Sequence, residues 1–126
     1  MPQVVVVIDN DQSLVEFLAI AFEDKGFTVH TALDGRQGLE LVRTHRPAVV
    51  LTDLMMSELH GLEVVQQVRA EPSLADTVVI VMSAKTYKTD IARTRELGAD
   101  GYLVKPFKSG ELLALVERLV AARHSR

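Results

Sequence analysis

Short runs of apolar and β-branched residues alternate five times along this chain with stretches of helical periodicity. The runs are Val4–Ile8, Phe27–Ala32, the apolar start of Ala48–Ser57, Thr77–Met82 and Gly101–Val104. Runs of this length are typical of strands buried on both faces, as in a parallel sheet. Regular alternation of strand and helix favours such a sheet with helices on both faces and right-handed crossovers. The sequence therefore predicts an α/β fold with five strands and five helices.

Each run is followed by a stretch whose apolar residues recur every three or four positions, as in an amphipathic helix. The expected buried stripes are Leu14, Phe17, Leu18, Ala21 and Phe22 in the first helix, Leu39 and Val42 in the second, Gly61, Val64, Val65 and Val68 in the third, and Leu112, Val116, Leu119 and Val120 in the fifth. Gly26 is expected to end the first helix, and Asp34 to cap the second.

The fourth predicted helix, at about Lys88–Leu97, differs from the others because most of its residues are charged or polar. Its clear apolar anchors are Ile91, Ala92 and Leu97. A helix with few buried contacts has low local stability, so we expect this segment to be the mobile part of the fold.

Composition narrows the class of protein. A chain of 126 residues is long enough for one domain that buries about two-thirds of its unfolded surface. The absence of cysteine excludes thiolate chemistry and suits a reducing cytoplasm. A net charge of −3 argues against direct nucleic-acid binding, and no apolar run approaches the ~20 residues that span a bilayer. The four histidines lack the spacing of zinc ligands.

Polar residues stand where the predicted strands end. Asp9 and Asn10 follow the first strand, Asp53 ends the third, and Ser83 and Lys105 follow the fourth and fifth. In a doubly wound sheet these ends share one edge, beside the point where the winding reverses. Carboxylates gathered there need a cation, and hard oxygen ligands suit Mg²⁺ or Mn²⁺ better than zinc. A carboxylate nucleophile, a metal, a lysine and a hydroxyl together suit phosphoryl transfer.

Each of these residues also has an ordinary explanation when it is taken singly. Asp53 alone would be a turn residue after a strand, Ser83 a strand-end hydroxyl and Lys105 a solvated lysine. Asp11 fits a helix N-cap better than a metal ligand. Their joint occurrence at one edge of the sheet favours the functional interpretation.

The order and spacing of these residues carry a resemblance to a known family. Asp53 precedes Ser83 by 30 residues and Lys105 by 52, and Gly98–Phe107 reads GADGYLVKPF. Over residues 1–126 the chain resembles a receiver domain of the two-component response regulators, similar to the chemotaxis regulators. The resemblance implies a flavodoxin-like doubly wound sheet of strand order 2-1-3-4-5. The tail at residues 124–126 resembles a cut end, which is compatible with a second domain following it in a longer protein.

The family's metal and phosphoryl roles pass to matching residues of this chain. Asp53 resembles the phosphoacceptor, and Asp9 resembles the first acid of the pair that holds Mg²⁺ or Mn²⁺. The backbone carbonyl of Met55 resembles the remaining protein ligand. Asn10 stands where the family usually has its second metal-bound acid. An amide oxygen still ligates a hard cation but adds no negative charge, so we expect weaker Mg²⁺ binding and slower phosphorylation.

The resemblance also implies a switch. Ser83 would bond the phosphoryl oxygens, Lys105 would pair with them, and Tyr102 resembles the aromatic residue that turns inward when Ser83 moves. The Lys105–Pro106 peptide bond is expected to be cis. Phosphorylation would then change the face formed by the fourth helix, the fifth strand and the fifth helix.

The implied function is that of a cytoplasmic signalling protein that promotes its own phosphorylation and dephosphorylation and is not an enzyme acting on free substrates. Its partners would be a sensor histidine kinase or phosphotransfer protein and a downstream output domain or protein, with no nucleic acid or membrane bound by this domain. Two alternatives stay open. Asn10 gives weight to a phosphate-independent interaction domain, and Asp9 at the end of a strand also resembles the nucleophile of haloacid-dehalogenase-like phosphatases.

Overall fold

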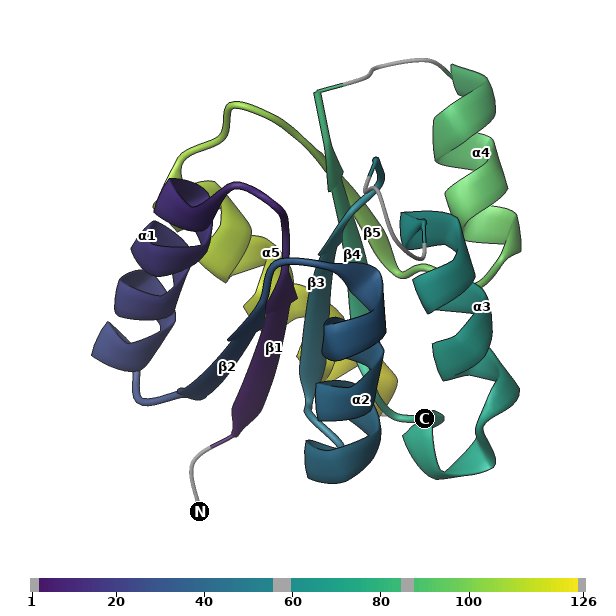
Figure 1. Ribbon diagram of the computed structural model, residues 1–126, viewed down its shortest axis with the longest axis horizontal. Coiled ribbons are helices and arrows are strands. Elements are labelled where there is room, and N and C mark those ends of the chain that lie inside the picture. The colour runs from purple at the N-terminus through teal and green to yellow at the C-terminus, as the bar shows by residue number, and fades with distance from the viewer. Residues whose placement is uncertain (1–2, 56–59, 85–87, 125–126) are drawn as a thin grey trace.

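The computed structural model describes residues 3–55, 60–84 and 88–124, which form a parallel sheet of five strands flanked by helices (Figure 1). The strands are β1 (Val4–Ile8), β2 (Thr28–Ala32), β3 (Val49–Asp53), β4 (Val78–Ser83) and β5 (Gly101–Val104). The helices are α1 (Gln12–Asp24), α2 (Gly35–His45), α3 (Gly61–Ala70), α4 (Lys88–Glu96) and α5 (Ser109–His124), with a 3-10 turn, η1, at Pro72–Leu74. The strand order β2-β1-β3-β4-β5 confirms the predicted flavodoxin-like topology. No helix in these ranges is both long and apolar enough to cross a membrane.

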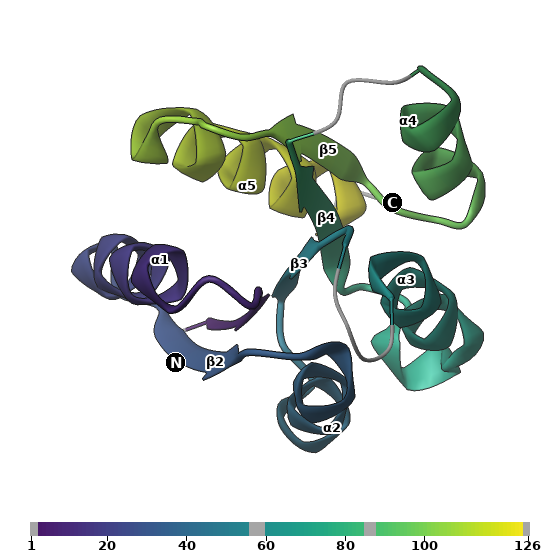
Figure 2. The ribbon, with the colours of Figure 1, turned by 45° about the horizontal axis from the view of Figure 1, so that its top comes forward.

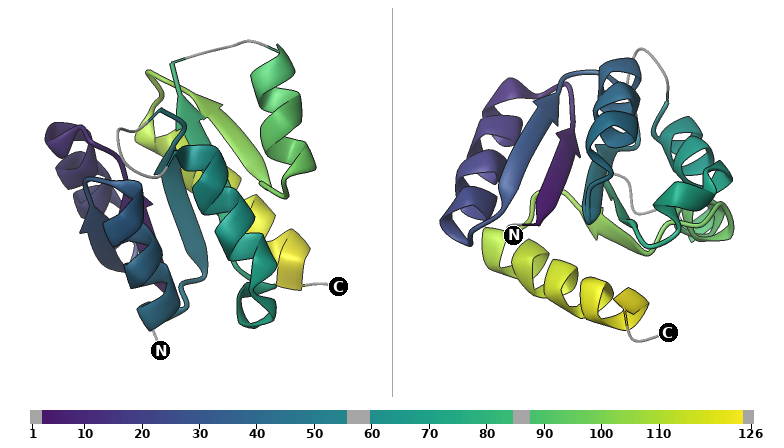
Figure 3. Two further views of the ribbon diagram at one scale, coloured as in Figure 1. Left: turned by 45° about the vertical axis from the view of Figure 1, so that its right-hand side comes forward. Right: turned by 90° about the horizontal axis from the view of Figure 1, so that it is seen from below.

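Helices cover both faces of the sheet. The helices α1 and α5 lie on one face, and α2, α3 and α4 lie on the other (Figure 2, Figure 3). Successive side chains of a strand point to opposite faces, so Val5 and Val7 belong to the core beneath α1 and α5, and Val6 and Ile8 to the core beneath α2 and α3. Every residue of β3 and β4 is buried, which explains why these strands read as continuous apolar runs.

Side-chain and backbone caps fix helix ends. Asp11 Oδ1 accepts a hydrogen bond from Leu14 N at 3.2 Å, and Asp34 Oδ1 accepts one from Gln37 N at 2.8 Å. Each bond satisfies an N–H group that the first turn of a helix leaves without a partner. Gly98 ends α4 with a φ of 109°, a backbone conformation that glycine adopts without steric cost.

Two of the predicted helix stripes are wrong in detail. On α1, Phe17 is 49% exposed, and Val15 takes the buried place expected for it, because the stripe is rotated about the helix axis. On α4, Ala92 is exposed and Thr94 is the buried residue. A threonine can occupy this place because its hydroxyl donates to the carbonyl oxygen of Ile91 at 2.9 Å, within the same helix.

An ion cluster at Asp100 joins α3, the sheet and the end of α5. Asp100 Oδ2 accepts hydrogen bonds from Arg69 Nη2 at 2.7 Å and Val79 N at 2.9 Å, and Oδ1 accepts one from Arg123 Nε at 3.0 Å. Arg123 also donates to the Ala75 carbonyl oxygen at 2.5 Å. The last turns of α5 are therefore held at the amino edge of the sheet, where the strands begin.

Candidate functional site

Three charged side chains meet at the carboxyl edge of the sheet. Asp9 follows β1, Asp53 is the last residue of β3, and Lys105 follows β5. Lys105 Nζ donates hydrogen bonds to Asp9 Oδ2 at 2.7 Å and to Asp53 Oδ1 at 3.2 Å. The fold thus joins Asp9 to two residues that follow it in the sequence by 44 and 96 positions, Asp53 and Lys105. We call this cluster of three residues the acid pocket.

The backbone around Asp9 holds its carboxylate in place. Asp9 is fully buried, and its N–H donates to the Ala32 carbonyl oxygen of β2 at 3.1 Å. Its Oδ1 atom accepts a hydrogen bond from Asp11 N at 3.0 Å, which leaves Oδ2 for Lys105. Both oxygens of this buried carboxylate are therefore engaged, as a charged group at this depth requires.

A close approach of α3 supports the backbone at Asp53. Leu54 N donates to the Met82 carbonyl oxygen at 2.9 Å, and Gly61 N donates to the Leu54 carbonyl oxygen at 3.1 Å. A Cβ atom at Gly61 would overlap the Asp53 carbonyl oxygen and the Leu54 Cα atom. The sequence pattern placed Gly61 only on the apolar stripe of α3, and its second role, next to Asp53, depends on the tertiary fold.

The acid pocket perturbs its own ionisation. Burial raises the pKa of Asp53 above its ordinary value, and the nearby charge of Asp9 raises it further, which together outweigh the opposing effect of Lys105. Burial alone would lower the pKa of Lys105, but hydrogen bonds and charge attraction from Asp9 and Asp53 raise it above the ordinary lysine value. Lys105 therefore keeps its positive charge, and the Asp53 carboxylate beside it is harder to ionise than an aspartate in water.

Ser83 and Lys105 are joined through their backbones. Ser83 ends β4 and is buried, and its carbonyl oxygen accepts a hydrogen bond from Lys105 N at 2.8 Å. Ser83 also pairs with Val104 in the parallel ladder between β4 and β5. The Lys105–Pro106 peptide bond is cis, which confirms the prediction for this bond. The hydroxyl-bearing residue and the lysine therefore lie at the same level of the carboxyl edge.

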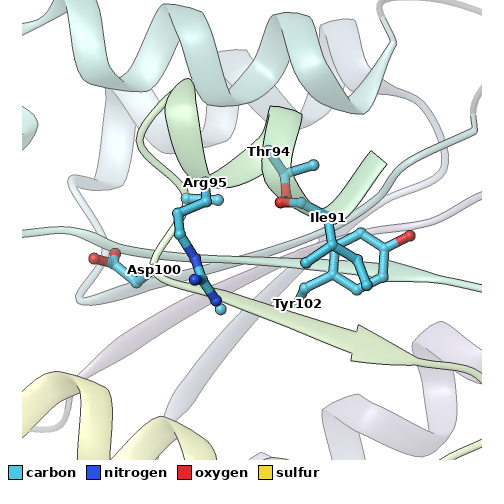
Figure 4. A pocket seen from close by; sticks show the side chains of 7 residues that line it. Ile91, Thr94, Arg95, Asp100 and Tyr102 are labelled. Atoms are coloured by element: carbon cyan, nitrogen blue, oxygen red, sulfur yellow. The ribbon is translucent and has the colours of Figure 1, made fainter. Parts of the chain in front are cut away.

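Tyr102 lies outside the acid pocket. It is half-buried on β5 and lines a cavity of about 20 Å³ beneath α4, together with Ile91 and Thr94 (Figure 4). Its ring lies next to the Ile91 side chain in this view. Tyr102 pairs with Val81, two positions before Ser83 on β4. The residue predicted as a switch thus lies beneath the thinly packed helix α4.

The other two predicted metal ligands lie at the rim of the acid pocket. Asn10 and Met55 are exposed, and each stands within two residues of a pocket carboxylate. Within residues 3–55, 60–84 and 88–124, no group of three or more His, Cys, Asp or Glu side chains is placed to hold a metal ion. Oxygens from an amide and a backbone carbonyl would have to complete a site for a hard cation here.

The family model of the response regulator receiver domain matches residues 5–117. The chain belongs to the response regulator receiver domain family. The DNA-binding response regulator MtrA of Mycobacterium tuberculosis is 40% identical over 116 residues, which are 92% of this chain and 50% of that protein. The response regulator MprA of Mycolicibacterium vanbaalenii is 37% identical over 120 residues, 95% of this chain and 51% of that protein.

The chain spans about half the length of these curated relatives. Among solved structures, the chemotaxis response regulator CheY4 of Vibrio cholerae superposes with a TM-score of 0.88 at 28% identity, covering 94% of this chain and 99% of that one. These similarities identify the chain as a receiver domain of the two-component response regulators. They give no support to the phosphatase-like alternative.

Proposed function

We propose that Asp53 accepts a phosphoryl group from a phosphohistidine on a sensor histidine kinase or phosphotransfer protein. The observation that carries this proposal is the double hydrogen bond of Lys105 to Asp9 and Asp53 at the carboxyl edge. In the reaction an Asp53 carboxylate oxygen forms a bond to phosphorus while the bond from phosphorus to the donor's imidazole nitrogen breaks. The imidazole nitrogen keeps the electron pair, and Asp53 becomes an acyl phosphate.

The donor atoms of the pocket fit a magnesium ion. Asp9 and Asp53 supply carboxylate oxygens that share one ammonium group, and Asn10 and the Met55 carbonyl would add neutral oxygens beside them. Bound there, the cation would neutralise phosphoryl oxygens as charge develops on them. Asn10 lacks the charge of a carboxylate, so this site is expected to hold Mg²⁺ more weakly than a site with a third acid.

Lys105 and Ser83 would receive the phosphoryl group. Lys105 keeps its proton at neutral pH because its pKa is raised, so its ammonium can move from the carboxylates to the phosphoryl oxygens. The Ser83 hydroxyl would donate to the same group from the end of β4. Both contacts exist only with the phosphoryl group present, and such differential contacts can shift a conformational equilibrium.

The face formed by α4, β5 and α5 would report the modification. On α4 the one buried residue among Lys88–Glu96 is Thr94, so this helix is held by few apolar contacts and can repack at low cost. Tyr102 lies beneath it, beside the small cavity. A downstream output domain or protein would then bind this face in a phosphorylation-dependent way.

Phosphorylation by a small acyl phosphate tests the proposal. Wild type, Asp53→Asn and the control Asp76→Asn would be incubated with acetyl phosphate and Mg²⁺, and incorporation measured by intact mass. Asp76 is an exposed acid outside the pocket. We expect one phosphoryl group on wild type and Asp76→Asn and none on Asp53→Asn. Equal incorporation in all three proteins would remove Asp53 from its role.

A receiver fold kept for protein docking without phosphorylation is the second candidate, and the neutral side chain at Asn10 favours it. A calorimetric Mg²⁺ titration of wild type and Asn10→Asp distinguishes the two. Binding by wild type that tightens in Asn10→Asp supports the metal-dependent site. No binding to wild type at millimolar Mg²⁺, together with intact partner binding, supports docking alone.

A further inference from the structure

Two imidazole rings stack where the end of α2 meets the sheet. The rings of His30 and His45, which we call the histidine pair, have centroids 3.7 Å apart and planes inclined by 13°. His30 is half-buried in the middle of β2, and His45 is the exposed last residue of α2. Because β2 is at the edge of the sheet in the described part of the chain, this contact joins the edge strand to the helix that covers it.

Two rings stacked this closely are more stable when at most one of them is charged. Neutral aromatic rings attract when they stack, whereas two imidazolium ions at this separation repel. Burial lowers the pKa of His30, and the charge of His45 lowers it further. Acid therefore adds positive charge to a contact that is more stable without it.

Other charges near the histidine pair are those of the elements packed on β2. Within the described residues, the charged groups on α2 and directly after it are Arg36, Glu40, Arg43 and Arg46, and those at the end of α1 and in its turn are Glu23, Asp24 and Lys25. His45 is the charged group that acts on the pKa of His30. No carboxylate in the described part of the chain is identified as a counter-ion that would favour the protonated His30 ring.

The strand that carries His30 also supports the acid pocket. His30 pairs with Val6 of β1, and two residues later the Ala32 carbonyl oxygen accepts the hydrogen bond from Asp9 N. Movement of β2 would therefore reach the backbone of Asp9 through one strand pairing. This link does not depend on whether Asp53 is phosphorylated.

We propose that the histidine pair is a pH-sensitive clasp, closed at neutral pH, that holds the edge strand β2 against the end of α2 and opens as His30 becomes charged beside His45. The folded state binds fewer protons at His30 than the unfolded chain does. The stabilisation is therefore complete above the ordinary histidine pKa of about 6.5 and is lost as the pH falls through the lower folded value.

Histidine titration by NMR tests the clasp, with wild type, His45→Gln and the control His60→Gln compared from about pH 7.5 to about pH 5.5, which brackets the ordinary histidine pKa. In wild type, backbone amide signals of β2 and the last turn of α2 should shift with the same midpoint as the His30 ring. His45→Gln should move the His30 midpoint to higher pH, and His60→Gln, which changes a histidine at the start of α3, should leave it unchanged.

Urea unfolding of the same proteins at both ends of this pH range gives an independent measurement. Acidification should lower the unfolding midpoint less in His45→Gln than in wild type and His60→Gln. An unchanged His30 midpoint in His45→Gln, or β2 amides that do not follow the His30 ring in wild type, would overturn the proposal. If a variant fails to fold, the wild-type result decides the question on its own: the β2 amides either follow the His30 ring or they do not.

Discussion

Replacing Lys105 with methionine would leave the two carboxylates of the acid pocket without their shared cation. Methionine keeps most of the length and apolar volume of the lysine side chain but cannot donate hydrogen bonds. Lys105 Nζ lies 2.7 Å from Asp9 Oδ2 and 3.2 Å from Asp53 Oδ1, and the Asp9 side chain is 0% exposed. The variant would therefore contain two buried like charges in one pocket.

The expected cost follows from this burial. Removing one partner of a buried ion pair costs roughly 3–5 kcal/mol, and the 23% exposure of the Lys105 side chain reduces this to about 2–3 kcal/mol at pH 7. The penalty exists only while the carboxylates are charged. In the variant, burial and the charge of Asp9 act on Asp53 without the opposing effect of Lys105, so the folded pKa of Asp53 lies above the unfolded value of about 3.9. The penalty is therefore present at neutral pH and disappears as the pH falls below about 4.

Urea unfolding followed by far-UV circular dichroism measures the cost, since the chain has no tryptophan for fluorescence. With a slope of roughly 1–3 kcal/mol per molar urea, the midpoint of Lys105→Met should fall by about 1–3 M at pH 7. Lys108→Met, an exposed lysine three residues later, is the matched control and should unfold as wild type does. Equal midpoints for the two variants at pH 7, or a difference that persists at about pH 4, would refute the reasoning.

Asp100→Ala should lower the free energy of unfolding by about 3 kcal/mol, because it leaves the part-buried Arg69 without its carboxylate. The control Asp76→Ala, at an exposed acid, should change it by less than about 0.5 kcal/mol. Equal unfolding temperatures for the two variants would contradict a stabilising role of the ion cluster. Gly61→Ala should lower the free energy of unfolding by about 1–3 kcal/mol, since the new Cβ atom would overlap the backbone at Asp53. The control Gly110→Ala has open space around the new methyl group and should be neutral or stabilising by up to about 1 kcal/mol. Equal unfolding temperatures for the two variants would argue against the close approach of α3. The raised pKa of Lys105 predicts that its contribution to the free energy of unfolding is fully present below about pH 10.4 and is lost as the pH rises through the pKa of Lys105 in the folded protein. In denaturant titrations, the Lys105→Met variant should lack this loss of stability at alkaline pH.

The sequence predicted the fold well because local pattern and burial agree in most elements. Strands buried on both faces appear in the sequence as continuous apolar runs. The predicted bounds of the first strand are those that β1 has in the structure. The errors lie where packing decides which side of a helix faces the sheet. Phe17 is apolar but lies outside the core, and Thr94 is polar but lies inside it. Hydrophobicity alone cannot distinguish such positions, since the rotation of a helix is set by its neighbours.

Part of the site could be predicted in the same way, and part could not. The carboxyl ends of parallel strands meet, so Asp9, Asp53 and Lys105 were expected at one edge, although the strand order came from the family resemblance. The contacts of Asp100 were not expected, because its partners lie 31 and 23 residues away on two helices. Nothing in the local pattern distinguishes a partly buried, ion-paired acid such as Asp100 from a solvated one.

The ion cluster at Asp100 holds the last turns of α5 at the edge of the sheet where β1 begins, and the acid pocket lies at the opposite edge. A fluorophore or solid support attached to a side chain in the last turns of α5 would therefore lie some five strand residues, about 16 Å, from the carboxylates. Protein labelled or immobilised at this place should in consequence leave the approach to Asp53 open to incoming molecules.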